Sequence, residues 1–165
     1  MVEPKDRKDS GKDAPDIVIL PPVLDALAIA AAVGLEWLIP LPILPERFTA
    51  WSVAVGVIIL AVGGGLALWG ILSFLRAKTN ILPTQPSLVI VETGPFRFTR
   101  NPMYIGVTGF LIALGFIFSL DWALILAPIV FGILHFGVVL REETYLAEKF
   151  GAPYVAYLER TRRWI

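Results

Sequence analysis

The chain contains no cysteine and only one histidine, His135. The lack of cysteine excludes a disulfide framework, a thiolate metal site and a cysteine nucleophile. A single histidine is also too few for the usual ligand set of a zinc or haem centre. We therefore expect no metal site in this protein.

Charged residues are scarce as well. They make up only 17% of the 165 residues, while hydrophobic residues make up 56%. This composition excludes an ordinary soluble globule and is typical of an integral membrane protein. The formal net charge is zero, which offers no electrostatic basis for binding nucleic acid.

Three long segments lack Lys, Arg, Asp and Glu altogether, namely 51–75, 101–120 and 122–140. Each is long enough to cross about 30 Å of hydrocarbon as a helix. An earlier apolar segment, 20–39, carries Asp25 and Glu36 near its ends. We interpret it as a short or tilted span, with an interfacial helix as the alternative. Glu36 lies near its outer end beside Trp37, which favours an interfacial position over a functional one.

We therefore predict an all-α polytopic membrane protein with about four transmembrane helices, at 20–39, 51–75, 103–119 and 122–140. Residues 1–16 form a disordered tail, because they are polar and have no apolar face. This tail mixes both signs of charge, so it is not a cleaved signal peptide. Residues 17–165 form a single domain.

Lysine and arginine are distributed unevenly among the segments between the spans. Thirteen of the 14 lie in the N-terminal tail, the 76–100 loop and the C-terminal tail, and only Arg47 lies on the other side. By the positive-inside rule, both termini and the 76–100 loop are cytoplasmic, and a bacterial chain of this kind would reside in the inner membrane.

The connections between spans give further expectations. Only Ser119-Leu120-Asp121 joins the last two spans, which predicts a tight helical hairpin with Ser119 or Asp121 capping the second helix. The glycines of the second span, Gly63-Gly64-Gly65 with Gly56 and Gly70, favour close helix packing or a kink. A phosphate cradle is less consistent with them, since no strand precedes and no lysine follows.

Short cytoplasmic helices follow the hairpin over 141–165, with a break at Gly151. Their apolar face, which includes Tyr154 and Tyr157, packs on the bilayer surface or covers a cytoplasmic pocket. Trp164 and Ile165 can anchor the end of the chain at the headgroups.

Two polar clusters border the hairpin. Residues 94–106 read GPFRFTRNPMYIG, and residues 141–164 read REETYLAEKFGAPYVAYLERTRRW. The hairpin brings them to the same membrane face. Charges at such positions are commonly topology signals or salt bridges, and Tyr104 can serve as an interface aromatic.

These two strings, over roughly residues 79–165, resemble the isoprenylcysteine carboxyl methyltransferase and phospholipid methyltransferase superfamily of integral membrane enzymes, which use S-adenosylmethionine. Many members have histidine where this chain has Asn101. Because an amide does not titrate, Asn101 cannot act as a general base, while a role in cofactor binding stays open.

The resemblance implies a cytoplasm-facing methyltransferase that binds S-adenosylmethionine. It assigns catalytic roles to Glu143 and Arg100. The arginines would hold the cofactor carboxylate, the glutamates its ammonium or ribose hydroxyls, and the aromatic rings its adenine or sulfonium. The expected cofactor-binding residues are Gly94, Arg97, Arg100, Asn101, Pro102, Tyr104, Glu142 and Glu143.

The methyl acceptor is a lipophilic or amphiphilic small molecule that arrives from the bilayer and carries a carboxylate, an amine or a thiol. An amine or thiol must lose a proton, for which Glu143, Glu142 and His135 are the candidates. His135 otherwise only hydrogen-bonds a neighbouring helix. The alternatives are a membrane sterol-type reductase that uses NADPH, and a non-enzymatic helical scaffold or transporter subunit. The oligomeric state stays open.

Overall fold

A computed structural model describes residues 13–44 and 48–165 and is entirely helical apart from loops, in agreement with the predicted fold class. Within these ranges there is no strand, only one isolated bridge between Thr99 and Arg162. The helices are α1 (Pro21–Leu38), α2 (Ala50–Arg76), the 3-10 turn η1 (Gly94–Arg97), α3 (Pro102–Phe118), α4 (Asp121–Leu134), the π-helical turn η2 (His135–Val139), α5 (Leu140–Phe150) and α6 (Ala152–Arg160).

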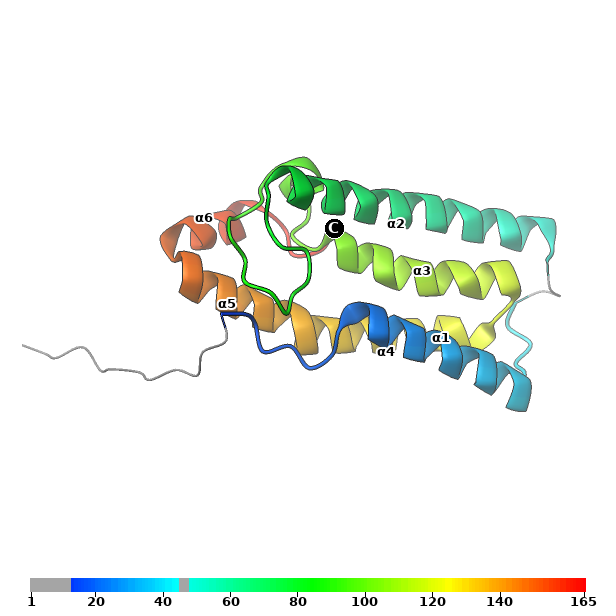
Figure 1. Ribbon diagram of the computed structural model, residues 1–165. Helices are drawn as coiled ribbons and strands as arrows, with labels where there is room; N and C mark the ends of the chain where they lie inside the picture. Colours follow the sequence, from blue (N-terminus) through cyan, green and yellow to red (C-terminus); the bar gives the residue numbers. More distant parts are fainter. Residues whose placement is uncertain (1–12, 45–47) are drawn as a thin grey trace, which may run out of the picture.

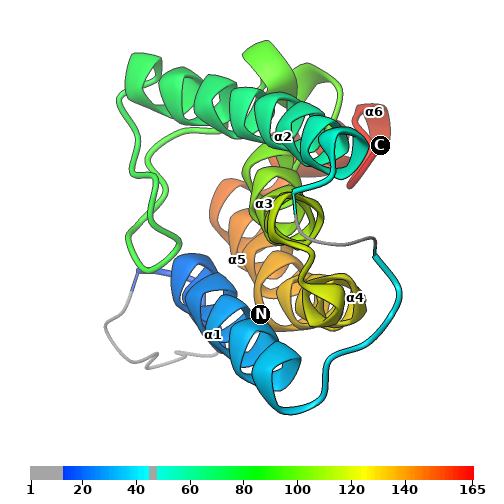
Figure 2. The same cartoon turned by 90° about the vertical axis from the view of Figure 1, so that its right-hand side faces the viewer.

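Four long helices run side by side as a bundle, with the short helices at one end (Figure 1). Viewed along the bundle, α3 lies between α2 on one side and the α1 and α4 pair on the other (Figure 2). Three helical stretches in the described part of the chain are long and apolar enough to cross a membrane: α1, α2 and the continuous run Asp121–Phe150. The fourth, α3, has 17 residues and spans about 25 Å.

A seam of small residues joins α2 to α3. Gly56, Gly63 and Gly70 recur every seven residues on one face of α2 and are buried, whereas Gly64 and Gly65 face open space. Opposite them, Gly106 lies so close that a Cβ built there would be 2.6 Å from Ala67 Cβ and 2.8 Å from Gly63 O. The glycines thus serve helix packing, as the sequence predicts.

The turn between α3 and α4 differs from the prediction in one respect. Ser119 adopts a left-handed conformation with φ 50°, and Leu120 N bonds to Gly115 O, which makes the hairpin tight. Neither Ser119 nor Asp121 caps α4. Instead, the buried Asp121 carboxylate accepts the backbone N–H groups of Ile43 (2.9 Å) and Leu44 (2.8 Å), so it fastens the α1–α2 connection to the hairpin.

From Asp121 to Phe150 the chain is one continuous helix interrupted by η2. A π-helical turn shifts the hydrogen bonds from i→i−4 to i→i−5 and leaves a carbonyl without its usual partner. Gly137 O accepts Val18 N at 3.0 Å, so the segment before α1 docks against this turn.

The prediction of a disordered tail is wrong for residues 13–16, which lie along this helix. Asp13 pairs with Lys149 and Asp16 with Arg141. Residues 1–12 of the predicted tail, and Arg47 of the external loop, lie outside the described residues.

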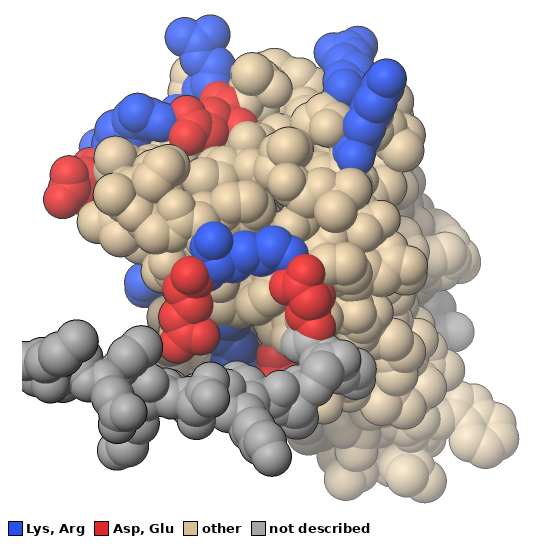
Figure 3. Space-filling model, turned by 60° about the vertical axis from the view of Figure 1, so that its left-hand side comes forward, with Lys and Arg blue, Asp and Glu red and all other residues tan. Residues whose placement is uncertain are grey.

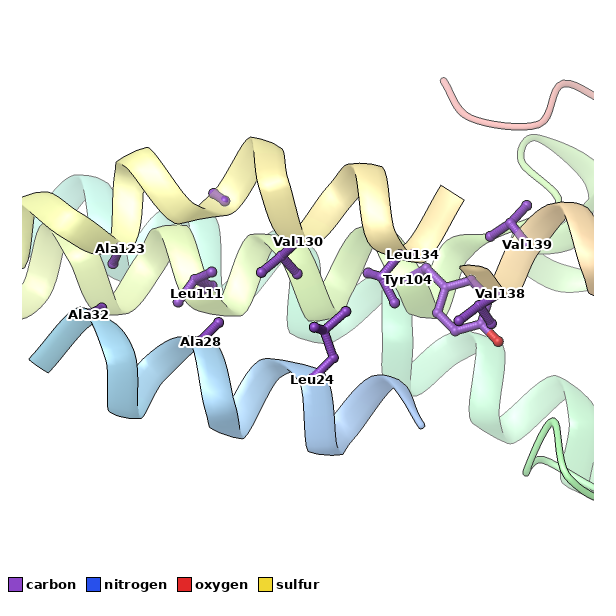
Figure 4. Packing of buried hydrophobic residues seen from close by; sticks show 11 residues of the cluster. Leu24, Ala28, Ala32, Tyr104, Leu111, Ala123, Val130, Leu134, Val138 and Val139 are labelled. Carbon is purple, nitrogen blue, oxygen red and sulfur yellow. The ribbon is translucent and has the colours of Figure 1, made fainter. Parts of the chain in front are cut away.

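The core lies where α1, α3 and α4 meet, and it extends into η2 (Figure 4). Leu111 and Leu134 are almost completely buried, and alanines of the same core, such as Ala32 and Ala123, allow the helices to approach closely. Tyr104 lies toward the end of the core where η2 begins. Near the other end, Trp122 N contacts Glu36 Oε2 at 3.4 Å and Trp122 Nε1 donates to Ile39 O at 2.7 Å.

Most large side chains of α2 point outward rather than into this core. A soluble protein would not expose so many apolar side chains on one helix, whereas lipid accepts them. The exposed ones are Trp51, Val57, Ile58, Val62, Leu68, Trp69, Leu72 and Leu75. In Figure 3, lysine, arginine, aspartate and glutamate gather at the end of the bundle that carries the short helices.

Candidate active site

A pocket of about 100 Å³ lies at this charged end. Its walls come from the 77–93 loop, the start of α3, the first turns of α5 and the helix α6. Apolar side chains form one part of the lining, including Leu82, Val89, Met103, Val139 and Leu146. Polar groups gather at another part, where Arg100, Asn101, Tyr104, Glu142 and Glu143 all line the pocket.

The 77–93 loop covers the pocket and is held in shape by its own polar groups. Asn80 Nδ2 donates to Pro86 O at 2.9 Å, and Leu88 N donates to Thr79 Oγ1 at 3.0 Å. Ser87 N reaches across to Tyr145 Oη on α5 at 3.3 Å. These bonds compensate for the absence of regular structure and make the loop a defined roof.

The junction 94–101 is anchored before it enters the pocket. Gly94 has φ 63°, and a side chain there would collide with Ser73 Oγ, so this glycine is needed for the turn against α2. Phe96 stacks on Phe74 with ring centroids 4.9 Å apart. Tyr157 of α6 donates to Phe96 O at 2.8 Å. The start of the junction is therefore fixed to both α2 and α6.

Two arginines share the carboxylate of Glu143. Arg163 approaches it with Nε at 3.0 and 3.2 Å and with Nη2 at 2.8 Å. Arg100 makes a single ion pair, from Nη2 to Glu143 Oε1 at 3.2 Å. The side chains of Arg100 and Glu143 are only 10% and 13% exposed, so water screens these charges weakly. Arg100 Nε is buried and has no hydrogen-bond partner among the described residues.

The neighbouring carboxylate has a different environment. Glu142 Oε2 accepts the hydroxyl of Tyr104 at 2.9 Å, and no described lysine or arginine forms a salt bridge with it. Glu142 lies in α5, beyond the apolar run that ends at Leu140. Burial raises its pKa to about 7, with the Tyr104 hydrogen bond opposing the shift and the negative charge of Glu143 adding to it. Glu142 is therefore partly protonated at neutral pH, unlike a carboxyl group in water.

The last residues of the chain form an extended strap, Thr161–Trp164, across the junction. Arg100 N donates to Arg162 O at 2.9 Å, and Asn101 Nδ2 donates to Arg163 O at 3.0 Å. The Asn101 side chain therefore binds the strap. Trp164 packs against Phe131, with ring centroids 4.6 Å apart, and against His135 at 5.9 Å. It folds back on the helix that carries His135.

Six of the predicted site residues line the pocket: Arg100, Asn101, Pro102, Tyr104, Glu142 and Glu143. Two do not. Gly94 packs against α2, and Arg97 is exposed and lies outside the lining. His135 also lies outside the pocket lining. The roles of all these residues stay predictions.

The site residues expected from the sequence did not include Arg163 or the tyrosines of α6. Tyr154 and Tyr157 are each 4% exposed and line the pocket, so the face of α6 covers it, one of the two placements we considered. Burial raises the pKa of both phenols above their ordinary value, which keeps them neutral donors. Nothing in the sequence pairs Arg163 with Glu143, because the strap's path decides that contact.

The model of one protein family, described as phospholipid methyltransferase, matches residues 51–153. This range includes α2, the pocket roof, the junction, the hairpin and both glutamates. No curated protein and no solved structure matches the chain significantly. The matched range covers well over half of the chain, so the protein belongs to the phospholipid methyltransferase family and is an integral membrane methyltransferase.

Proposed function

We propose that the protein binds S-adenosylmethionine in the pocket beneath the 77–93 loop and methylates a lipophilic or amphiphilic acceptor at the cytoplasmic membrane face. The observation that carries this proposal is the state of Arg100. It is nearly buried, it lines the pocket, and its Nε has no partner among the described residues. A buried cationic donor without a partner is costly, and a ligand carboxylate would satisfy it.

The other lining groups suit the rest of this cofactor. Tyr104, Tyr154, Tyr157 and Phe96 offer ring faces for an adenine or a sulfonium. Carboxylates at Glu142 and Glu143 suit an ammonium and ribose hydroxyls. The residues present therefore fit S-adenosylmethionine, which supplies an electrophilic methyl group when bound.

The chain's own residues would orient the reactants and exclude water. The roof loop and α6 cover the polar groups, so donors and charges act at low dielectric. An amine or thiol acceptor also has to give up a proton. Among Glu142, Glu143 and His135, we favour Glu142 as the group that receives it, because Glu143 is held by two guanidinium groups and His135 does not line the pocket.

Two features support an acceptor that comes from the bilayer on the cytoplasmic side. Apolar side chains of the roof, such as Leu82 and Val89, line the pocket and are also 48% and 44% exposed. These side chains can therefore contact the apolar part of an acceptor both outside the loop and inside the pocket. The bias of lysine and arginine toward this end favours the cytoplasm, with both termini on that side.

Calorimetry on the purified protein in detergent tests the proposal, with S-adenosylhomocysteine as the probe. We expect the wild type to bind it and Arg100→Ala and Glu143→Ala to abolish measurable binding. Arg162→Ala is the matched control, since this exposed arginine lies outside the pocket and should retain the wild-type affinity.

Three results would distinguish the alternatives. Binding of NADPH without S-adenosylhomocysteine would replace the methyltransferase by a reductase of the sterol type. Binding of neither would leave a scaffold or transporter subunit and refute the proposal. If S-adenosylhomocysteine binds, transfer of a labelled methyl group into a membrane extract then identifies the class of acceptor.

A further inference from the structure

The carboxylate of Glu143 lies between two guanidinium groups but is not shared equally. Arg163 makes three contacts of 2.8 to 3.2 Å with it, in the two-pronged geometry that suits a carboxylate. Arg100 makes one contact, an ion pair at 3.2 Å. Arg163 is thus the principal partner of Glu143, although Arg100 is the arginine that lines the pocket.

This division leaves hydrogen-bonding capacity on Arg100. Its Nε has no partner among the described residues, and its Nη1 reaches only a long bond of 3.4 Å to Leu158 O. We propose that Arg163 is a positioning residue: by making most of the bonds to Glu143, it leaves part of the Arg100 guanidinium available for the carboxylate of the pocket's ligand. The inference rests on the proposed function, because it assigns that ligand an amino-acid carboxylate.

Removal of Arg163 would change the competition for Arg100. The Glu143 side chain is only 13% exposed, so water would solvate its negative charge poorly once Arg163 is gone. Glu143 would then form more hydrogen bonds with the remaining guanidinium, that of Arg100. A second hydrogen bond between Glu143 and Arg100 would then take the place of the bonds to Arg163. The donors that face the pocket would be consumed inside the protein, and an incoming carboxylate would meet an arginine that is already neutralised.

The strap holds Arg163 in place from its backbone. Arg163 O accepts both Asn101 Nδ2 (3.0 Å) and Thr99 Oγ1 (3.2 Å). On either side, Arg162 O accepts Arg100 N and Trp164 packs on Phe131. The backbone of Arg163 is therefore fixed by the same junction that carries Arg100, which keeps the two arginines in register with Glu143.

A pair of ligands separates this positioning role from a merely structural one. S-adenosylhomocysteine carries the amino-acid carboxylate, whereas 5′-methylthioadenosine keeps the adenosine and the thioether and lacks it. For Arg163→Ala we expect the affinity for S-adenosylhomocysteine to fall about tenfold or more, as for the loss of a charge-assisted hydrogen bond. The affinity for 5′-methylthioadenosine should stay within about twofold. Arg162→Ala, an exposed neighbour on the same strap, is the matched control and should bind both ligands normally.

Two further arms keep the test decisive. Methylguanidinium added to Arg163→Ala should restore affinity for S-adenosylhomocysteine, since it replaces the missing partner of Glu143. Arg163→Lys should recover only part of it, because an ammonium lacks the two-pronged geometry.

An equal loss of affinity for both ligands without rescue would show a structural role and overturn the inference. Wild-type affinity of Arg163→Ala for S-adenosylhomocysteine would also overturn it, while the proposed function would stand. A wild type that does not bind S-adenosylhomocysteine would refute both, and this result is visible before any variant is made.

Discussion

Gly106 is a position where a single added methyl group should disturb the packing of α3 against α2. A Cβ there would lie 2.6 Å from Ala67 Cβ and 2.8 Å from the carbonyl oxygen of Gly63, and real Cβ contacts below 3.0 Å essentially never occur. The second contact is with backbone, so no rotamer change relieves it and α2 has to move away from α3.

Overpacking of this kind typically costs about 1–3 kcal/mol. Alanine offsets at most about 1 kcal/mol of this cost through its better helix propensity. We therefore expect Gly106→Ala to lower the free energy of unfolding by about 1–2 kcal/mol. Gly64→Ala on the open face of α2 is the matched control, and it should be neutral or slightly stabilising, since nothing lies within 4 Å of the added methyl.

Unfolding by sodium dodecyl sulfate in mixed micelles, followed by tryptophan fluorescence, measures both variants. Ala67→Gly in the Gly106→Ala background should recover part of the stability, because it removes one of the two close contacts and leaves the other. If Gly106→Ala unfolds at the same detergent fraction as Gly64→Ala, α2 and α3 do not approach each other this closely.

Two further predictions concern buried carboxylates. Asp121→Ala leaves the N–H groups of Ile43 and Leu44 without their acceptor, so it should lower the free energy of unfolding by about 1.5–3 kcal/mol in the same assay. Asp121→Asn keeps one oxygen and should lower it less. If Asp121→Ala is as stable as the wild type, Asp121 does not hold the α1–α2 connection to the hairpin. Burial raises the pKa of Glu142 from 4.5 to about 7, so the folded state holds its proton more tightly than the unfolded state does. The resulting contribution to the free energy of unfolding, about 3 kcal/mol, is fully present below about pH 4.5 and is lost as the pH rises through 7. Glu142→Gln should remove this pH dependence of stability, and an unchanged pH profile would refute the assignment.

The arrangement of the helices could be predicted because charge and apolar length are local properties of the sequence. The uncharged segment from Trp122 to Leu140 and the three-residue turn before it predict a helical hairpin. The hairpin brings Arg100 and Glu143 to the same end of the bundle. The five glycines of the second span predict close helix packing, which Gly56, Gly63 and Gly70 provide against α3. In contrast, Gly64 and Gly65 are equally small and face open space.

The remaining features depend on where distant segments come to rest. Asp121 has the chemistry of a helix cap, yet the two N–H groups it binds lie 77 and 78 residues away. Arg163 could pair with any carboxylate at this end of the bundle until the strap's hydrogen bonds to Thr99 and Asn101 select Glu143. No periodic pattern encodes either outcome, because each is decided by tertiary packing.

The π-helical turn at His135–Val139 sets the rotational phase between the two halves of one long helix. It accommodates one residue more than an α-helical turn would, and each residue turns a helix by about 100°. An uninterrupted α-helix of the same sequence would thus present Glu142 and Glu143 on a different side of the bundle, where neither Tyr104 nor the strap could reach them. The additional residue in the π-helical turn lets α5 present its glutamates to the pocket, while the apolar sequence pattern of α4 stays suited to its own packing.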